Sequence, residues 1–372
     1  MKSYEEMTKE ELLKEKEGLE AEYKKFQQRG LKLDMSRGKP SQEQLDLSMG
    51  MMDVLTSGVD LTCDDGTDCR NYGVLDGISE AKQLIGDMIE CNPDNIIIYG
   101  NSSLNVMYDT VARSMTHGVC GSTPWCKLDE VKFLCPVPGY DRHFKITEFF
   151  GIEMINVPMS PEGPDMDMVE KLVSEDPAIK GIWCVPKYSN PQGITYSDET
   201  VHRFAKLNPA AEDFRIFWDN AYTVHHLTSQ PDLLLNIQEA CKKAGYPDRV
   251  FEFTSTSKVS FPSSGIALFA SSDTNVTWLK NQLSFQTIGP DKLNQLRHMR
   301  FFRDEDGIKA HMKKHAELLA PKFNIVLETL EKELKDNDLA SWSSPKGGYF
   351  ISLDVNHCSA KRVGEICKEL GV

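Results

Sequence analysis

The sequence predicts an α/β protein in which a mostly parallel, wound sheet forms a large domain and a smaller α+β domain follows it. Three observations support this prediction. Between about residues 72 and 283, short apolar runs rich in β-forming residues alternate with stretches of helical periodicity. After Pro290 the composition changes: the chain becomes strongly charged, and its apolar residues recur with helical spacing. The length of 372 residues is sufficient for two domains.

The first 49 residues are expected to form an N-terminal helix or arm that joins the small domain. Residues 4–29 are charged and favour a helix. Thr8 with Glu11 three residues later is the capping-box pattern that starts such a helix. The helix gives way at Gly30 to a short alternating stretch that runs into a turn at Gly38 and Pro40.

Residues 50–290 are expected to form the large domain, and its apolar runs are its predicted strands. Nearly continuous apolar character is typical of strands that are covered on both faces. The clearest runs lie at residues 95–99, 131–135, 181–185, 214–218, 250–253 and 266–269.

Residues 291–372 are expected to form the small domain. The charged stretch 300–336 predicts helix, with Pro321 marking a helix start or a kink. Residues 347–353 predict a strand and residues 360–370 another helix. This order of elements indicates an α+β unit.

The composition excludes several classes of partner. With 42 basic and 56 acidic residues the net charge is −14, whereas a nucleic-acid partner requires a basic face that releases counterions. No apolar stretch approaches the roughly 18 residues of a membrane span, and the N-terminus has no apolar signal region. We therefore expect a cytoplasmic protein that binds neither nucleic acid nor membrane.

No metal or redox site is predicted either. The 10 cysteines are scattered along the chain without a CxxC pair, so zinc and redox motifs are unsupported. The pair His225 and His226 has no third ligand at a suitable spacing, and packing or exposure explains it more simply.

Polar groups follow the predicted strands, at the edge of the sheet where ligands bind in wound folds. The run ending at Tyr99 continues as Gly-Asn-Ser-Ser-Leu, residues 100–104, and then a helical pattern. Free N–H groups and hydroxyls at a helix start can hold a phosphate, although serine there is often only a cap. Asn190 stands in the polar segment after the run ending at Val185.

Two of these strand ends deliver ionisable side chains. Asp219 follows the run 214–218, and a carboxylate in such a desolvated crevice requires a cation. Lys258 follows the run 250–253 among the hydroxyls of Ser255 and Ser257. A lysine in that setting can have a lowered pKa and act as an amine nucleophile toward a carbonyl.

Together these motifs resemble the fold-type I pyridoxal-phosphate enzymes, specifically the class I/II aminotransferases. The resemblance rests on Asn-Pro-x-Gly at 190–193, Asp-x-x-Tyr at 219–222 and Ser-x-Ser-Lys at 255–258. It covers nearly the whole chain from Gly38 onward. Further motifs are most similar to the aspartate-aminotransferase-like subgroup, often labelled MocR-like; they lie at residues 37–40, 100–104, 138–143 and 288–292.

The resemblance implies pyridoxal 5′-phosphate (PLP) as cofactor and gives roles to the motif residues. Lys258 would hold the cofactor aldehyde covalently and then move a proton between substrate and cofactor. Asp219 would keep the pyridine nitrogen protonated. Asn190 and Tyr222 would hydrogen-bond the phenolic oxygen, and Tyr140 would stack on the ring.

The resemblance also implies a phosphate site and a homodimer. Tyr72 would reach the phosphate of the neighbouring subunit, so the active enzyme would be a dimer. The other phosphate contacts within the chain would be Ser102, Ser103, the backbone of Leu104, Ser255 and Ser257.

The substrates implied are an L-amino acid and a 2-oxo acid, with aspartate or glutamate as the best-supported amino donor. The substrate-binding positions are Gly38, Asn190 and Lys292. Lys292 is the expected cation for a side-chain carboxylate, with Arg37 and Arg142 as alternatives, because the net negative charge of the protein would otherwise repel a dicarboxylate.

Two features depart from the family pattern. The family commonly places an arginine for the phosphate within about eight residues after the lysine, and none follows Lys258 here. Hydroxyls, helix dipoles or a more distant cation would have to balance the charge of the phosphate instead. The family arginine for the substrate α-carboxylate lies beyond the position of Val372, so we expect either a truncated sequence, which we favour, or another mode of carboxylate binding.

Two other functions are compatible with the same residues. A β-lyase or a decarboxylase would use the same fold, because the cofactor supplies the carbanion chemistry. A non-catalytic PLP-binding regulatory domain would carry a DNA-binding domain before the aminotransferase-like part, and the residues before Gly38 are too few for a winged helix-turn-helix. The sequence therefore favours a transaminase.

Overall fold

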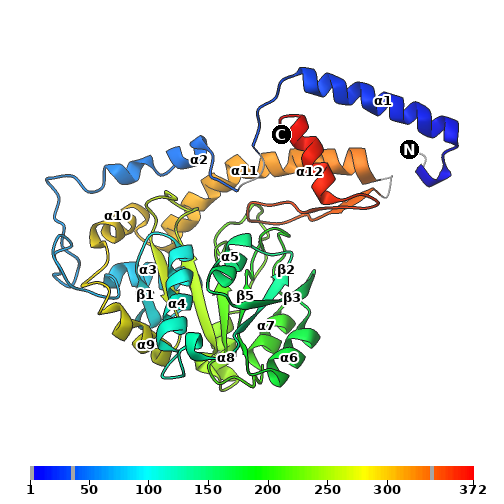
Figure 1. The fold of residues 1–372 in the computed structure, drawn as a ribbon. Helices are drawn as coiled ribbons and strands as arrows, with labels where there is room; N and C mark the ends of the chain where they lie inside the picture. Colours follow the sequence, from blue (N-terminus) through cyan, green and yellow to red (C-terminus); the bar gives the residue numbers. More distant parts are fainter. Residues whose placement is uncertain (1–3, 35–37, 336–338) are drawn as a thin grey trace.

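The structure is a computed structural model that describes residues 4–34, 38–335 and 339–372. Its largest part is an eight-stranded sheet with helices on both faces (Figure 1). The strands are β1 Ile96–Ile98, β2 Lys132–Val137, β3 Glu153–Ser160, β4 Gly163–Pro164, β5 Ile179–Cys184, β6 Arg215–Asp219, β7 Val250–Ser255 and β8 Ala267–Ala270.

The strand order is β1-β8-β7-β6-β5-β2-β3-β4. Strands β7, β6, β5, β2 and β3 run parallel to one another, while β8 is antiparallel to both β7 and β1. This confirms the predicted mostly parallel sheet, and every predicted strand of the large domain overlaps an observed one. The sequence analysis missed β3, because only Val157 of that strand is buried and the run is not continuously apolar.

Alternate side chains of the central strands enter different cores. On β6, Ile216 and Trp218 pack against one helical layer, and Phe217 between them packs against the other. Each fully buried apolar side chain of this kind stabilises the fold by about 1.5–3 kcal/mol. The first layer comprises α6 Met166–Glu175, α7 Asp198–Ala205 and α8 Ile237–Lys243, and the second α4 Ser103–His117, α5 Asp141–Phe149 and α9 Asp273–Leu283. Helices therefore cover both faces of the sheet. Because the strands are held between them, the positions of the loops at the carboxyl edge are fixed as well.

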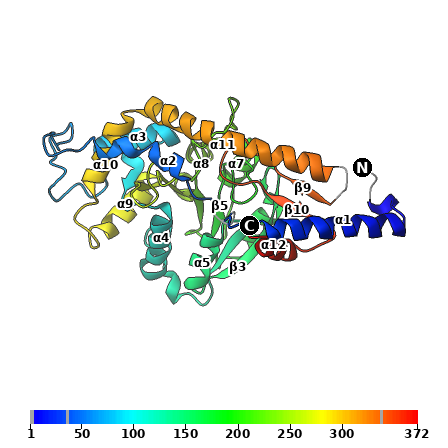
Figure 2. The same ribbon diagram turned by 90° about the horizontal axis from the view of Figure 1, so that it is seen from above.

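A third core covers the β1–β8 end of the sheet. It contains side chains of α3 Ser79–Ile89, α10 Lys292–Phe302 and the first part of α11 Glu305–Leu334. Asp304 caps α11 by accepting a hydrogen bond from Gly307 N at 2.8 Å. The helix then runs through Pro321 and extends beyond the large domain (Figure 2). Of the two alternatives predicted for Pro321, a helix start is therefore wrong, and a kink stays a prediction.

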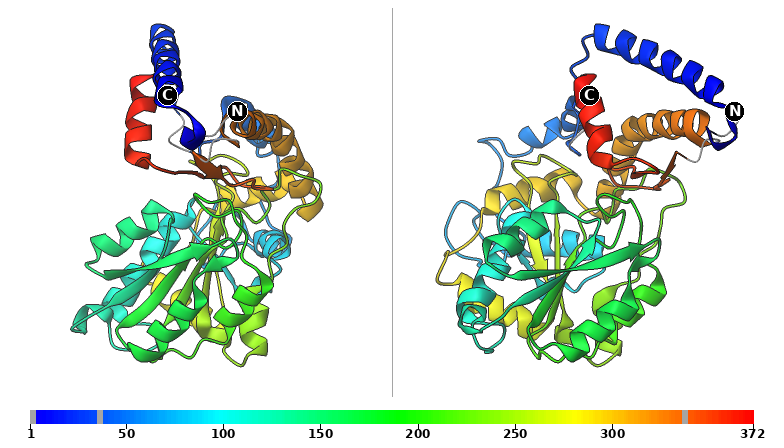
Figure 3. Two further views of the ribbon diagram at one scale, coloured as in Figure 1. Left: turned by 90° about the vertical axis from the view of Figure 1, so that its right-hand side faces the viewer. Right: turned by 45° about the vertical axis from the view of Figure 1, so that its right-hand side comes forward.

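The remaining elements lie on the carboxyl side of the large sheet (Figure 3). The capping box at Thr8 is confirmed at the start of α1, and Leu33 N donates to Gly371 O at 2.8 Å, which ties the two chain ends together. These elements are α1 Lys9–Gln28, α2 Gln42–Asp46, the antiparallel pair β9 Ala340–Trp342 and β10 Leu353–Val355, and α12 Ala360–Glu369. Short 3-10 helices lie at Tyr4–Glu6, Met49–Met52, Pro93–Asn95, Trp125–Lys127 and Pro247–Arg249.

The predicted helix at 360–370 is confirmed, whereas the predicted strand at 347–353 is wrong apart from its last residue. Gly347 and Gly348 instead lie against Tyr188: a Cβ on Gly347 would lie 2.2 Å from the Tyr188 ring, and a Cβ on Gly348 would lie 2.9 Å from the Tyr188 Cβ. The division into residues 1–49, 50–290 and 291–372 stays a prediction. Within the described residues, no helix is both long and apolar enough to cross a bilayer.

Candidate active site

The ionisable side chains predicted at the strand ends meet at the carboxyl edge of the sheet. Asp219 is the last residue of β6 and pairs with Phe253 of the neighbouring strand β7. Lys258 follows β7, and its Nζ lies 4.9 Å from the ring centroid of Tyr222. The structure therefore brings Asp219, Tyr222 and Lys258 together.

Asp219 is only 3% exposed, and its two carboxylate oxygens have different surroundings. Oδ2 lies 2.9 Å from Nε2 of His143, a buried ring that stacks on Trp183 at 4.5 Å between centroids. Oδ1 is buried without a hydrogen-bond partner. Since a buried unpaired carboxylate oxygen is costly, this atom marks a place for a hydrogen-bond donor or a cation.

Lys258 has the electrostatics of an amine nucleophile. Burial lowers its pKa, and the nearby Asp219 charge raises it only in part. A lowered pKa increases the share of unprotonated amine at neutral pH, and the unprotonated amine is the form that attacks a carbonyl.

Two phenols border the same space. Tyr140 precedes α5, and its ring meets His143 edge-on at 5.0 Å between centroids. Burial, together with the charge of Asp219, raises the pKa of both Tyr140 and Tyr222. Both phenols are therefore protonated at neutral pH and can donate hydrogen bonds.

The first half of the predicted phosphate site is the start of α4. Ser102 caps this helix, its Oγ accepting a hydrogen bond from Leu104 N at 3.3 Å, and Ser103 is the first helical residue. A helix of 15 residues presents unpaired N–H groups and a partial positive charge at this end.

The second half comes from the segment that carries the lysine. Ser255 Oγ donates to Ser257 Oγ at 3.0 Å, and Ser257 Oγ donates to the Asn101 carbonyl at 3.1 Å, which joins the two halves. A Cβ on Gly265 would lie 3.0 Å from Ser257 N and 3.2 Å from Asn101 O, so glycine keeps this corner open. The predicted serines thus line one small polar cradle.

Helix α10 holds the lysine segment from behind and supplies a cation that the sequence analysis missed. Asn294 Nδ2 donates to Gly265 O at 2.9 Å, and Arg297 Nη2 donates to Ser264 Oγ at 2.7 Å. Arg297 Nε is buried without a partner. Arg297 is therefore a candidate for the more distant cation that could take the place of an arginine close to Lys258. No motif near Lys258 predicts Arg297, because Arg297 belongs to α10 and is distant from the lysine in sequence.

Tyr349 is a second residue that the sequence analysis missed. Its ring centroid lies 6.3 Å from that of Tyr222 and 5.9 Å from that of His225. The backbone bond from Gly348 N to His225 O, at 2.9 Å, anchors this segment beside the site. Two adjacent glycines before an aromatic residue are the available signal, but their setting among apolar residues also fits the strand predicted at 347–353.

Two of the predicted substrate-binding positions lie in different segments. Gly38 packs against Phe350, and Asn190 lies in a turn of residues 189–194. A Cβ on Gly38 would lie 2.8 Å from the Phe350 ring, so the N-terminal segment packs closely there. Asn190 is half-buried in the turn closed by the bond from Ser189 N to Ile194 O at 2.8 Å. Arg37 lies outside the described residues.

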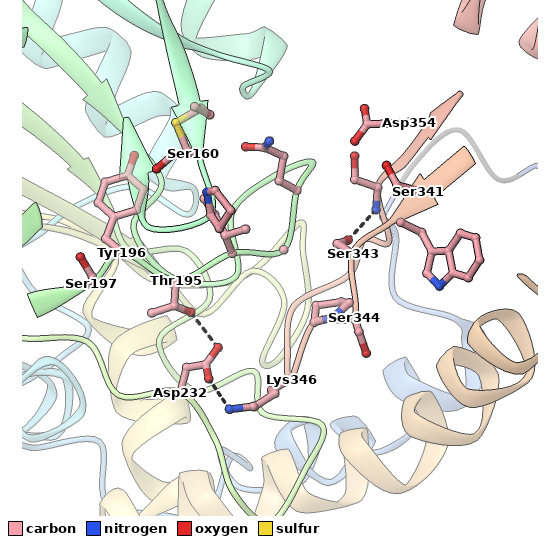
Figure 4. A pocket seen from close by; sticks show the side chains of 18 of the residues that line it. Ser160, Thr195, Tyr196, Ser197, Asp232, Ser341, Ser343, Ser344, Lys346 and Asp354 are labelled. Atoms are coloured by element: carbon pink, nitrogen blue, oxygen red, sulfur yellow. Dashed lines mark hydrogen bonds and ion pairs between the residues drawn. The ribbon is translucent and has the colours of Figure 1, made fainter. Parts of the chain in front are cut away.

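A pocket of about 630 Å³ lies beyond the Asn190 turn, between residues 192–198 and 341–346 (Figure 4). Asp232 accepts a hydrogen bond from Thr195 Oγ1 at 3.2 Å and forms an ion pair with Lys346 at 2.9 Å. Neither Lys258 nor Asp219 lines this pocket. It therefore adjoins the candidate site without belonging to it.

Tyr72 and Lys292 lie together on another part of the chain. Tyr72 is 81% exposed, whereas Lys292 is 3% exposed and donates from Nζ to the neighbouring Gly73 carbonyl at 2.9 Å. Among the described residues, no hydrogen bond or ring contact joins either of them to Lys258 or Asp219. A single chain does not bring these two positions into contact with the site.

Comparisons with known proteins agree with this geometry. The family described as aspartate amino-transferase matches residues 7–372. A putative aminotransferase of Mycolicibacterium smegmatis is 46% identical over 372 residues, which is 100% of this chain and 87% of that protein. An aspartate aminotransferase of Corynebacterium glutamicum is 46% identical over 357 residues, 96% of this chain and 82% of that protein.

Solved structures give the same result for the fold. The crystal structure of an aspartate transaminase from Corynebacterium glutamicum has a TM-score of 0.95 and 44% identity, over 100% of this chain and 87% of that chain. The structure of a putative aminotransferase from Corynebacterium diphtheriae has a TM-score of 0.92 and 48% identity, over 95% of this chain and 87% of that chain.

Proposed function

The chain belongs to the aspartate aminotransferase family and is an aminotransferase; from this premise we propose that it binds PLP at Lys258 and transfers the amino group of aspartate or glutamate to a 2-oxo acid. The narrower MocR-like assignment stays a prediction. The observation that carries the cofactor proposal is the buried, unpartnered Oδ1 of Asp219 beside an amine of lowered pKa.

The residues present fit PLP. Asp219 Oδ1 offers an acceptor for a protonated ring nitrogen, and Lys258 offers an amine for the aldehyde. The serine cradle, the start of α4 and Arg297 offer hydroxyls, N–H groups and positive charge for the phosphate. When bound, PLP supplies an electron sink for the substrate α-carbon.

The chain's own residues would then do the remaining work. Lys258, once released from the aldehyde, is the base that takes the α-proton and the acid that returns it. Tyr222 lies under its amine and restricts where that amine can move. His143 holds Oδ2 of Asp219, so that Oδ1 stays aimed at its partner.

The proposed function is tested by adding each amino acid in turn to the cofactor-loaded protein and recording its absorbance. Aspartate or glutamate should remove the absorbance of the aldehyde form, and a 2-oxo acid should restore it. A β-lyase would instead keep the aldehyde form while releasing ammonia and an oxo acid. That outcome would contradict transamination as the main reaction.

Substrate choice gives a first prediction. The Lys292 amine donates one hydrogen bond, to the Gly73 carbonyl, and the residue is 3% exposed, so a substrate carboxylate would have to replace that contact in a site shared between two subunits. We expect Lys292→Ala to lower kcat/KM for aspartate by roughly 30-fold to 1,000-fold, on the order of 2–4 kcal/mol, while sparing alanine and phenylalanine.

The matched comparison is Arg142→Ala, which removes an exposed cation next to Asp141 at the start of α5. Steady-state kinetics with all three amino acids separate the two positions. If Lys292→Ala lowers all three values equally, the residue supports the Gly73 loop and does not select the substrate. If wild type prefers phenylalanine, the dicarboxylate proposal itself is wrong.

A homodimer gives a second prediction. The segment that adjoins Gly73 exposes Phe285 by 94% and Ile288 by 65%, next to exposed Tyr72. Apolar side chains exposed together mark an interaction surface. We expect wild type to be a dimer in light scattering, and Phe285→Asp with Ile288→Asp to give a monomer that has lost most activity, because Tyr72 would no longer reach a second site.

The control for the dimer experiment is Leu233→Asp, since Leu233 is 84% exposed beside the Asp232 pocket. This variant should remain dimeric and active. A monomeric wild type with full activity would contradict the proposal.

A further inference from the structure

A chain of buried polar side chains connects the residue after Lys258 to Tyr349. Gln44 Nε2 lies 2.9 Å from Tyr349 Oη and 3.2 Å from His315 Nδ1. His315 Nε2 lies 3.1 Å from His311 Nε2, which in turn lies 2.9 Å from the Val259 carbonyl. Gln44, His311 and His315 are all buried. They come from α2 and α11, outside the motifs that carry the resemblance.

The orientation of Gln44 fixes the tautomer of His315. Gln44 Oε1 accepts the backbone N–H of Ser41 at 3.0 Å in the capping box of α2, so its NH₂ group faces Tyr349 and His315. His315 Nδ1 must therefore accept, and the proton of the neutral ring lies on Nε2.

His311 carries its proton on the same atom. The Val259 carbonyl can only accept, so His311 Nε2 is the donor in their contact. Two Nε2–H groups then stand 3.1 Å apart, so they do not bond each other and each requires an acceptor. The Val259 carbonyl has two lone pairs, and the buried Ser48 Oγ, 3.3 Å from His311 Nε2, offers a second acceptor.

This pairing requires neutral rings. A second proton on His315 would sit on Nδ1 and face the Gln44 NH₂ group. Burial lowers the pKa of His311 and lowers that of His315 to about 4, so both rings are neutral at physiological pH. The other titratable groups that influence or face the two rings are His225, Tyr349 and Lys314.

We propose that Gln44, His311 and His315 are positioning residues that hold the Val259 carbonyl, one residue after Lys258, and Tyr349 in a fixed relation as long as both imidazoles are neutral. The inference rests on the proposed role of Lys258. Tyr349 packs on Tyr222, and Tyr222 lies under the Lys258 amine, so one end of the path is linked to the lysine through Tyr222 and the other through the backbone at Val259. The N-terminal segment thereby becomes part of the active site.

The first experiment compares Gln44→Leu with Gln42→Leu in the cofactor-loaded protein. Gln42 is exposed on the same helix and donates from Nε2 to Asp46 of that helix at 2.8 Å. We expect Gln44→Leu to lower kcat about 10-fold with little change in KM, and to shift the pH midpoint of the cofactor absorbance by about 0.5 unit or more. Gln42→Leu should match wild type in both. Thermal unfolding checks that each variant is folded.

If Gln44→Leu does not fold, Gln44→Glu keeps the shape and tests the same claim. Its carboxylate would favour a second proton on His315, and the absorbance midpoint should again move. Midpoints equal to wild type in the folded Gln44 variants would overturn the proposal.

The second experiment reads the tautomers directly, by NMR of wild-type protein with ¹⁵N-labelled histidine. His311 and His315, assigned by single substitutions, should both show protonated Nε2 and unprotonated Nδ1 at physiological pH. Protonated Nδ1 on His315 would overturn the inference. Borohydride mapping of the cofactor to Lys258 is independent of this result, so failure of the inference and failure of the proposed function are distinguishable.

Discussion

Lys258→Ala is expected to lose transamination activity almost completely, by about 10⁴-fold or more, because one side chain both binds the cofactor and moves the proton. The surroundings of the lysine support both tasks: burial lowers its pKa, and the Tyr222 ring lies 4.9 Å from its Nζ. Steady-state kinetics with aspartate and 2-oxoglutarate measure the loss. Activity at the wild-type rate would contradict the assignment.

Lys187 provides the matched control for the lysine assignment. It is also buried, burial also lowers its pKa, and it stands after the neighbouring strand β5, donating to the Thr223 carbonyl at 3.1 Å. Borohydride reduction followed by peptide mapping should place the cofactor on Lys258 in wild type and in Lys187→Ala. An adduct on Lys187 would show that a low pKa alone selects the reactive amine. The serine cradle and Asp219 would then have no part in placing the cofactor.

Much of the fold was predictable because a parallel sheet covered on both faces imposes a simple pattern. Strands such as β6, with Ile216 and Trp218 in one core and Phe217 in the other, must be apolar at successive positions. Strand β3 has only one buried residue and gives no such signal. The segment 347–352 resembles a strand in composition, but its conformation is set by close contact of two glycines with Tyr188, which no local pattern encodes.

The candidate site divides in the same way. Asp219, Ser255, Ser257 and Lys258 were predictable, because parallel strands deliver their ends to one edge of the sheet. Arg297 and Tyr349 were not, because their contacts with Ser264 and Tyr222 join elements that are distant in sequence. A motif search near the lysine cannot find the arginine of another helix.

Asp219→Asn is expected to lower kcat by roughly 10³-fold, about 4 kcal/mol, while the protein stays folded and retains some cofactor. A carboxylate at Oδ1 stabilises a cation beside it, whereas an amide does not. The apo protein should be as stable as wild type or more so, because the substitution removes a buried charge whose Oδ1 has no partner. Kinetics, cofactor absorbance and the thermal unfolding of the apo protein measure the three quantities.

The control for this experiment is Asp213→Asn, at a second buried carboxylate of the large domain. Asp213 is fully engaged: Lys180 Nζ lies 2.7 Å from Oδ1, and Trp125 Nε1 donates to Oδ2 at 2.8 Å. Removing its charge leaves a buried lysine unpaired, which costs on the order of 3–5 kcal/mol of stability and should not affect kcat of the folded enzyme.

The two substitutions should therefore have opposite effects: Asp219→Asn loses activity and keeps stability, and Asp213→Asn loses stability and keeps activity. An unchanged kcat in Asp219→Asn would mean that the unpartnered Oδ1 of Asp219 has no role in the reaction. The proposal that the chain binds PLP here would then lose its main supporting observation.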